Sequence, residues 1–265
     1  MPIALHYITN EPLEAASARR AGVDRIMVDL EIMGKEQRQR GRSTVISRHS
    51  LRDVSAVRQR VPHGALLVRT NPPHPGLDRE VNEVIARGAD VVMLPMFTQP
   101  QEVALFVKAV ARRARVCLLL ETPQALTRLP LILSVPGIDE IMVGLNDLHL
   151  GLGLRFMFEC LAGGLVEHVA HQVRSAGISF GFGGIARVGE GLVPAELILS
   201  EHVRLGSSLV ILSRSFRAGA DIDLATEVGR VRAEEERLRG LSMVELQRNR
   251  MELCSRVWRI AGCLQ

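Results

Sequence analysis

Acidic side chains follow apolar runs at two points in this chain of 265 residues. Glu121 comes directly after the run 116–120, and Asn146 and Asp147 come after the run 140–145. A carboxylate at the end of a buried segment loses hydration, which is costly unless a cation compensates it. Two carboxylates without clustered histidines suit a hard divalent ion, Mg²⁺ or Mn²⁺. We therefore interpret Glu121 and Asp147 as candidate metal ligands, with a salt bridge inside the fold as the alternative.

Two other apolar runs also end in charged residues. Arg69 lies near the end of the run 65–70, and Asp29 and Glu31 lie at the end of the run 25–30. An arginine there can supply fixed positive charge to a developing enolate, while a bound metal ion acts as a Lewis acid. This combination indicates enolate chemistry that does not need a covalent intermediate.

Lysine is rare in this chain, and its positions argue against Schiff-base chemistry. That mechanism needs a lysine at the end of a strand. The only lysines are Lys35, expected in the loop after the run 25–30, and Lys108, expected in the middle of a helix. The histidines are scattered as well, and only His149 lies near a candidate site residue.

The elements that must position these residues alternate regularly along the chain. Short apolar runs are followed by polar, glycine or proline residues and then by segments with helical periodicity. Strands are expected at 3–8, 25–30, 65–70, 90–96, 116–121, 140–145, 179–184 and 208–213. Eight strands that alternate with helices predict a (β/α)8 TIM barrel, and a doubly wound open sheet is the alternative. The first strand is not followed by GxGxxG, which weakens the alternative.

The ends of several predicted helices are marked by residues that stop or start a helix. Asn10 and Ser50 are candidate N-caps, since their short polar side chains can accept a hydrogen bond from the first turn. Glycines stand where chains leave helices through a left-handed residue, at Gly22, Gly88, Gly177 and Gly206.

In a (β/α)8 barrel, the residues at the carboxyl ends of the strands face the active site. This rule brings the acids and the arginine to a single mouth: Asp29, Glu31, Arg69, Glu121 and Asp147. The glycine-rich segment 181–191 belongs to the same mouth. It could hold a phosphate with its backbone N–H groups, but we favour the alternative that the glycines serve a tight, flexible turn.

Composition narrows the class of protein. Hydrophobic residues make up 47% of the chain and aromatic residues only 3%, which predicts a large aliphatic core. The net charge of +4 is spread along the chain without a basic block, so nucleic-acid binding is not expected. The N-terminal residues show neither a signal peptide nor a membrane-spanning segment. We therefore expect a cytoplasmic protein that binds no membrane and acts on a small molecule.

The C-terminal part divides into two amphipathic segments. We assign residues 1–240 to the catalytic barrel and residues 241–265 to a helical extension, which Ser242 and Glu245 begin with a capping box. The extension carries the only tryptophan, Trp258. Its apolar face could pack on its own barrel or on a neighbouring subunit, because periodicity alone does not separate the two.

Five motifs in ordered succession carry a family resemblance: DRIMVDLE, LLVRTNPP, GADVVMLPMF, LLLETPQAL and IDEIMVGLNDLHLGLG. With these motifs, roughly residues 20 to 216 resemble the HpcH/HpaI aldolase and citrate lyase β-subunit family of phosphoenolpyruvate/pyruvate-binding barrels. The resemblance implies a divalent-metal-dependent lyase or aldolase, commonly a trimer or hexamer. In such proteins the C-terminal helices are often exchanged between subunits, which favours a homo-oligomer here.

The resemblance also implies roles for individual residues. The glutamate of the ET motif and the aspartate of the GxxDL motif, which hold Mg²⁺ or Mn²⁺, correspond to Glu121 and Asp147. The arginine of the VR strand, which binds the 2-oxo acid and steadies its enolate, corresponds to Arg69. Backbone groups after the fourth and seventh strands complete the substrate pocket, and these correspond to Pro95, Met96, Gly183 and Gly184.

One position departs from the family pattern. The hydroxy-oxo-acid aldolases carry a histidine after the acid of the second strand as general base, and this chain has Ile32 there. Glu31, Asp29 or a water on the metal could take its place.

The expected function is therefore cleavage or formation of a carbon–carbon bond next to a 2-oxo acid of the pyruvate type. The alternatives are an enzyme of the same superfamily that acts on a phosphorylated or CoA-linked substrate, and a non-catalytic barrel subunit.

Overall fold

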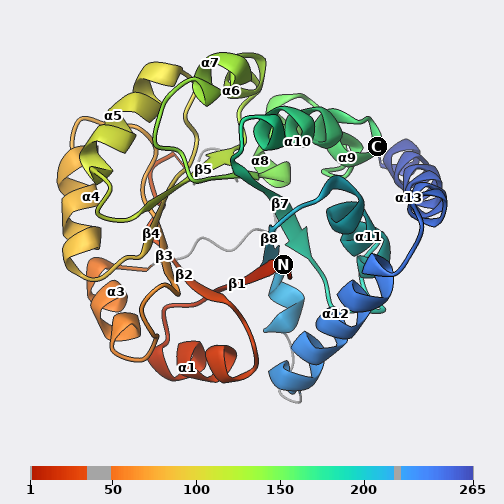
Figure 1. Ribbon diagram of the computed structural model, residues 1–265, viewed down its shortest axis with the longest axis horizontal. Helices are drawn as coiled ribbons and strands as arrows, with labels where there is room; N and C mark the ends of the chain where they lie inside the picture. Colours follow the sequence, from red (N-terminus) through yellow and green to blue (C-terminus); the bar gives the residue numbers. More distant parts are fainter. Residues whose placement is uncertain (1, 35–48, 218–221, 265) are drawn as a thin grey trace.

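The structure is a computed structural model that describes residues 2–34, 49–217 and 222–264. Its centre is a closed barrel of eight parallel strands in sequence order, which confirms the predicted (β/α)8 fold (Figure 1). The strands are β1 (Ala4–Ile8), β2 (Arg25–Asp29), β3 (Leu66–Arg69), β4 (Val91–Leu94), β5 (Arg115–Leu120), β6 (Glu140–Val143), β7 (Ser179–Ile185) and β8 (Leu209–Leu212).

Helices form a ring around this barrel (Figure 1). They are α1 (Pro12–Arg20), α3 (Leu51–Arg58), α4 (Leu77–Ala86), α5 (Pro100–Val110), α6 (Pro123–Thr127), α7 (Leu129–Leu133), α8 (Leu145–Gly151), α9 (Glu159–Ala162), α10 (Leu165–Ser175), α11 (Ala195–Leu205), α12 (Leu224–Arg239) and α13 (Met243–Cys263), with a short 3-10 helix, η1, at Arg214–Phe216. None of the helices within the described ranges is both long and apolar enough to cross a membrane.

The aliphatic core has two layers, because each strand is buried on both faces. The barrel interior is filled by Met27, Leu67, Val91, Met93, Cys117, Leu119 and Met142. A second and much larger cluster lies between the strands and the helices, and it includes residues such as Val28, Leu118 and Val166. The strand ends are therefore held rigidly from both sides.

Most of the predicted helix ends are found in the structure. Ser50 is the N-cap of α3, and its N–H donates to Asp53 Oδ2 at 2.7 Å. The prediction for Asn10 was wrong, because the N-cap of α1 is Glu11, next to Pro12 at the first helical position. The four glycines predicted to end helices all have left-handed φ angles, from 66° at Gly206 to 94° at Gly22.

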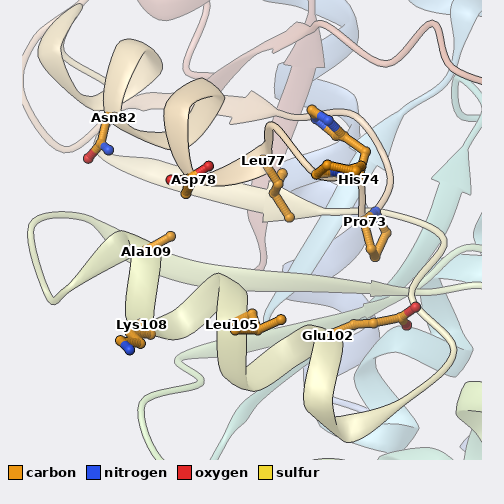
Figure 2. A pocket seen from close by; sticks show the side chains of 10 residues that line it. Pro73, His74, Leu77, Asp78, Asn82, Glu102, Leu105, Lys108 and Ala109 are labelled. Carbon is orange, nitrogen blue, oxygen red and sulfur yellow. The ribbon is translucent and has the colours of Figure 1, made fainter.

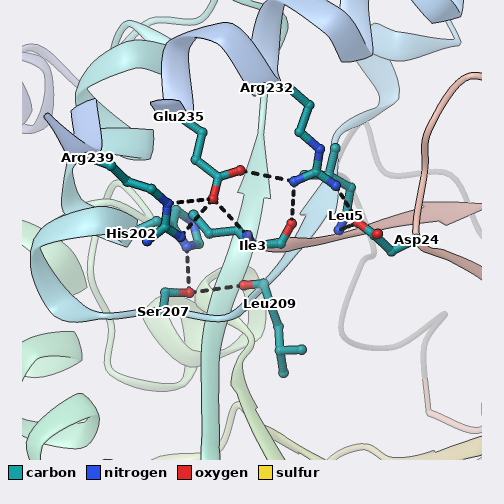
Figure 3. A network of polar contacts seen from close by, with 9 residues as sticks. All are labelled: Ile3, Leu5, Asp24, His202, Ser207, Leu209, Arg232, Glu235 and Arg239. Carbon is teal, nitrogen blue, oxygen red and sulfur yellow. Dashed lines mark hydrogen bonds and ion pairs between the residues drawn. The ribbon is translucent and has the colours of Figure 1, made fainter. Parts of the chain in front are cut away.

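Polar contacts at the amino-terminal end of the barrel attach the outer helix α12 to strand β1 (Figure 3). Glu235 Oε1 accepts a hydrogen bond of 2.8 Å from the N–H of Ile3. Arg232 donates to the carbonyl of the same residue at 2.7 Å and also pairs with Asp24. These contacts close the barrel where the last helix meets the first strand.

Helix α13 packs on its own barrel, against α11 and α9. Asn249 Nδ2 donates to Ser200 Oγ at 3.0 Å, and Arg250 pairs with Glu167 at 2.8 Å. Leu253 and Val257 are fully buried on this side of the helix. The segment that the sequence marks as surplus to the barrel is thus docked on its own chain.

Candidate active site

The carboxyl ends of β2 and β3 hold a buried cluster of one arginine and two acids. Arg69 donates to both carboxylate oxygens of Asp29, from Nε at 2.8 Å and from Nη2 at 2.7 Å. Nη2 also lies 3.4 Å from Glu31 Oε2. Asp29 and Glu31 are almost completely buried. Two strands that pair in register, Asp29 against Arg69, therefore bring these groups together.

Glu121 stands at the end of β5, on the other side of the same mouth. It is only 3% exposed, and its Oε1 accepts a hydrogen bond of 3.1 Å from the N–H of Met96. Met96 has a φ of 55°, in the left-handed region that side chains rarely adopt, and this turn aims its N–H at the carboxylate. Thr122 Oγ1 donates to the carbonyl of Phe97 at 2.7 Å and ties the next residue to the same loop.

Asp147 reaches the mouth from a helix rather than from a loop. Strand β6 ends at Val143, and α8 begins at Leu145, so that Asn146 and Asp147 both lie in its first turn. A cavity of about 420 Å³ opens beside the two carboxylates, and it is lined by Met96, Glu121, Thr122, Pro123, Gln124, Asp147, Leu150 and Gly151. Glu121 and Asp147 thus share one cavity wall.

The electrostatics of the two sides of the mouth differ. Burial raises the pKa of Glu121 well above its usual range; Arg69 opposes this, whereas Asp147 and Glu31 add to it. Burial lowers the pKa of Arg69, but Asp29 above all, and then Glu31 and Glu121, more than reverse this and raise it. The arginine therefore stays charged, while the surroundings of Glu121 disfavour the negatively charged form of its carboxyl group.

The donor set at Glu121 and Asp147 fits a hard divalent ion. Both groups offer carboxylate oxygens, and the raised pKa of Glu121 means that a nearby cation would relieve an unfavourable charge. Within the described residues, no group of three or more His, Cys, Asp and Glu side chains could hold a metal by itself. Two protein ligands suit Mg²⁺ or Mn²⁺, which usually keep waters or substrate oxygens in the remaining positions.

One group at the mouth, His49, was not found from the sequence. His49 Nδ1 accepts a hydrogen bond of 3.0 Å from the N–H of Asp29, and so extends the β2 ladder where β1 has ended. This histidine lies 20 residues further along the chain. The structure therefore places a histidine at the end of β2, but it is His49 and not the residue at position 32, where the family pattern has its histidine.

The segment that follows Glu31 is held by a polar brace. Asn71 Oδ1 accepts hydrogen bonds from the backbone N–H groups of Ile32 at 3.0 Å and Met33 at 3.1 Å. Glu80 on α4 in turn accepts from the backbone N–H and the side-chain amide of Asn71, both at 3.1 Å. This chain of contacts fixes the segment after Glu31 from the outer helix layer.

The residues predicted to bind substrate through their backbones lie at different places around the mouth. Met96 lines the cavity, but its N–H is directed at Glu121. Pro95 is buried beside it. Gly183 and Gly184 lie on β7 where its pairing with β8 shifts register, and an added Cβ at Gly183 would have Leu145 as its nearest neighbour, at 3.5 Å.

Lys108, the lysine that the structure describes, does not lie at the mouth. Lys108 lies on α5 and lines a separate cavity of about 730 Å³ between α4 and α5, on the outside of the barrel (Figure 2). Lys35 lies outside the described residues. In the glycine-rich segment, Arg187 pairs with Glu190 at 2.6 Å rather than reaching toward the two carboxylates.

The fold and the mouth together define a (β/α)8 barrel protein with an acidic site at the carboxyl ends of its strands. The family model described as HpcH/HpaI aldolase/citrate lyase matches residues 3–182, more than half of the chain. The chain therefore belongs to this family. No curated protein matches the sequence.

Solved structures show the same fold at low sequence identity. The HpcH/HpaI aldolase from Desulfitobacterium hafniense DCB-2 is 15% identical with a TM-score of 0.60, over 91% of this chain and 94% of that one. An HpcH/HpaI aldolase/citrate lyase family protein from Burkholderia cenocepacia J2315 is 16% identical with a TM-score of 0.62, over 90% and 95%. Citrate synthase SbnG is 16% identical with a TM-score of 0.60, over 80% and 86%. These likenesses support the barrel fold.

Proposed function

We propose that this protein is a divalent-metal-dependent aldolase or lyase that makes or breaks a carbon–carbon bond through the enolate of a 2-oxo acid such as pyruvate. The observation that carries the proposal is the pair Glu121 and Asp147 on one cavity wall, where the pKa of Glu121 is raised by burial and by its acidic neighbours. Membership of the aldolase/citrate lyase family agrees with this chemistry.

In this proposal the two carboxylates hold Mg²⁺ or Mn²⁺, and Arg69 supplies permanent positive charge. When bound, such an ion supplies Lewis-acid chemistry that favours negative charge on substrate oxygens. Asp29 occupies Nε and Nη2 of the guanidinium, and no described residue makes a hydrogen bond to Nη1. Arg69 can therefore direct Nη1 toward an anionic substrate while Asp29 holds its plane fixed.

The geometry favours Glu31 over Asp29 as the group that accepts a proton. Both oxygens of Asp29 receive hydrogen bonds from Arg69 at 2.7–2.8 Å, and this stabilises its carboxylate form. Glu31 Oε2 lies further from Nη2 of Arg69, at 3.4 Å, so its contact with this guanidinium is looser than that of Asp29. A general base must release part of its negative charge in the transition state, which the looser contact permits.

Exchange of the methyl protons of pyruvate in heavy water, followed by NMR, tests the proposal without knowledge of the acceptor. We expect exchange that requires Mg²⁺ or Mn²⁺ and that is abolished by Glu121→Gln and by Asp147→Asn. Glu83→Gln, which changes a carboxylate on the outer helix α4, is the matched control and should leave exchange intact.

Exchange that continues after removal of divalent ions, or in both mouth variants, would refute the proposal. Metal-dependent exchange seen only with a phosphorylated or CoA-linked analogue would instead support the alternative substrate class.

We also propose that the extension 241–265 contributes to a homo-oligomer, although α13 packs on its own barrel. Val244, Met251 and Trp258 are spaced by seven residues, so they lie on one face of the helix. They are 71%, 61% and 50% exposed, respectively. We expect Met251→Glu to lower the molar mass measured by light scattering, and Leu131→Glu, at an exposed leucine of α7, to leave it unchanged. A monomeric wild-type protein would contradict this proposal.

A further inference from the structure

Gly144 joins β6 to α8, and a carboxylate occupies the space where its side chain would be. A Cβ added at this position would lie 2.6 Å from Glu121 Oε2 and 2.8 Å from Glu121 Cβ. Non-bonded heavy atoms prefer separations of about 3.5–4.0 Å, so the methyl group and the glutamate cannot both occupy these places. Glu121 therefore stands directly over a backbone that has no side chain.

The backbone conformation of Gly144 does not itself require glycine. Its φ of −84° and ψ of 90° lie in a region that every residue can adopt. Other glycines of the chain, such as Gly22 with a φ of 94°, serve turns that L-residues rarely enter. At Gly144, alanine is disfavoured only because its methyl group would occupy the space of the Glu121 side chain.

Gly144 cannot move away from the glutamate without breaking regular structure. Its N–H donates to the carbonyl of Leu120 at 3.0 Å, which extends the β5–β6 ladder by one residue. Its own carbonyl accepts from the N–H of Leu148 at 3.1 Å, the bond that begins α8. The same residue thus terminates a core strand and starts the helix that carries Asp147.

Glu121 is equally restricted. It follows Leu120 at the end of β5, and Thr122 is tied to the carbonyl of Phe97. Its Oε1 is held by the N–H of Met96, a bond that would be lost if the side chain turned away from Gly144. An added methyl group must therefore displace the carboxylate from its place beside Asp147.

We propose that Gly144 is a positioning residue: its missing side chain forms the seat that holds the Glu121 carboxylate next to Asp147 for a divalent ion. The inference rests on the proposed function, since it assigns the two carboxylates to one metal site. It adds that a single glycine sets the relative position of both ligands, one by contact and one through the helix that it begins.

Mn²⁺ affinity, measured by electron paramagnetic resonance of the free ion at neutral pH, tests this inference. Gly144→Ala should weaken Mn²⁺ binding by about tenfold or more, because changes to groups that orient metal ligands lower affinity about 10–100-fold. In the Glu121→Gln background, Gly144→Ala should cause no further loss, because it acts through that carboxylate.

Two other glycines serve as matched controls. At Gly229, within α12, an added Cβ meets nothing within 4 Å, so Gly229→Ala should bind Mn²⁺ normally. At Gly181, on β7, an added Cβ would lie 2.4 Å from the carbonyl oxygen of Leu209. Gly181→Ala should therefore lower the melting temperature without weakening Mn²⁺ binding to the folded fraction. This variant distinguishes the effect of general crowding in the barrel from the effect of displacing the Glu121 carboxylate.

The outcomes decide the inference separately from the proposed function. Wild-type protein that binds Mn²⁺, with a folded Gly144→Ala variant that binds it equally well, overturns the inference alone. Wild-type protein that binds no Mn²⁺ overturns both. If Gly144→Ala does not fold, Glu121→Ala in the same chain should restore folding because it vacates the seat, and failure to do so also overturns the inference.

Discussion

Two buried glutamates, Glu121 and Glu140, stand at opposite ends of the barrel and have opposite surroundings. Glu140 begins β6 and is 1% exposed, and Glu121 follows β5 and is 3% exposed. Glu140 accepts from Arg25 through both oxygens, at 2.6 and 2.8 Å, and from Arg115 at 3.0 Å. Among the described residues, Glu121 accepts a hydrogen bond only from the backbone N–H of Met96, and its neighbours include further acids.

The difference is visible in the pKa of each group. Burial alone would raise the pKa of Glu140, but the hydrogen bonds and charge of Arg25, with help from His6 and Arg115, lower it overall. Burial raises the pKa of Glu121, and Arg69 does not offset it. Both residues are buried glutamates, but the charge of Glu140 is compensated by arginines, whereas that of Glu121 is not fully compensated. An unbalanced carboxylate costs stability, and this cost is expected where a cation from outside completes the site.

Glu140→Gln should produce the largest change in stability. Strands β2 and β6 lie on opposite sides of the closed barrel, so the pair of Glu140 with Arg25 crosses the barrel interior. Loss of the negative charge leaves Arg25 buried without its main partner, which typically costs about 3–5 kcal/mol. Urea unfolding measured by circular dichroism would show the loss as a lower midpoint with an unchanged slope.

The pH dependence of this loss has a definite direction. A lowered pKa in the folded state means that Glu140 stabilises the protein above its unfolded pKa, about 4.5, and that this contribution disappears as the pH falls through the folded pKa. The deficit of Glu140→Gln should therefore shrink in acid. A deficit that is constant from neutral pH to acid would show that shape, and not charge, determines the effect.

Glu121→Gln should change stability in the opposite direction. In metal-free protein the substitution removes a carboxylate that burial destabilises, and it keeps the shape and the acceptor for Met96 N–H. A gain of about 1 kcal/mol would raise the melting temperature by about 2–4 °C in a chain of this size. Excess Mg²⁺ should stabilise the wild-type protein but not this variant.

The direction of the pH dependence of stability again follows from the pKa of Glu121 in the folded protein. Since the pKa of Glu121 is raised in the folded state, the folded protein binds the proton more tightly than the unfolded chain, and stability falls as the pH rises above about 4.5. The advantage of Glu121→Gln should therefore be absent in acid and grow toward neutral pH. A variant less stable than the metal-free wild type at neutral pH would mean that another cation already balances Glu121.

The strands and the polar residues at their ends could be predicted from the sequence, because both depend on local patterns. The run 116–120 is apolar on both faces, and the acid that follows it had to emerge at the mouth once the barrel was assumed. The structure around Asp147 was harder to predict from the sequence. The residues after Asp147 show no clear helical pattern in the sequence, and in the structure they form α8, which packs against α9 and β7 with Leu145 and Leu148 buried.

Contacts between distant segments could not be predicted in this way. His49 meets Asp29 across 20 residues, and Asn71 holds Ile32 across 39. His49 belongs to none of the recognised motifs, and although Asn71 lies within LLVRTNPP, the motif does not indicate that its side chain binds the backbone after Glu31. Gly144 belongs to the recognised GxxDL motif, yet its role depends on where the Glu121 side chain points, which no spacing reveals.

Arg115→Ala should give the smallest effect and thereby sharpen the contrast between the two barrel ends. Arg115 also contacts Glu140, at 3.0 Å, but its side chain is 51% exposed, whereas that of Arg25 is 15% exposed. Water and salt screen a half-exposed pair, so its loss should cost less than about 1 kcal/mol. Arg25→Ala, measured in the same urea series, should cost several times more because it leaves Glu140 buried with only this screened partner. Equal losses of unfolding free energy in the two variants would mean that the two arginines act as one network. The stabilisation of the Glu140 carboxylate would then depend on both arginines together, and not on the buried pair with Arg25 alone.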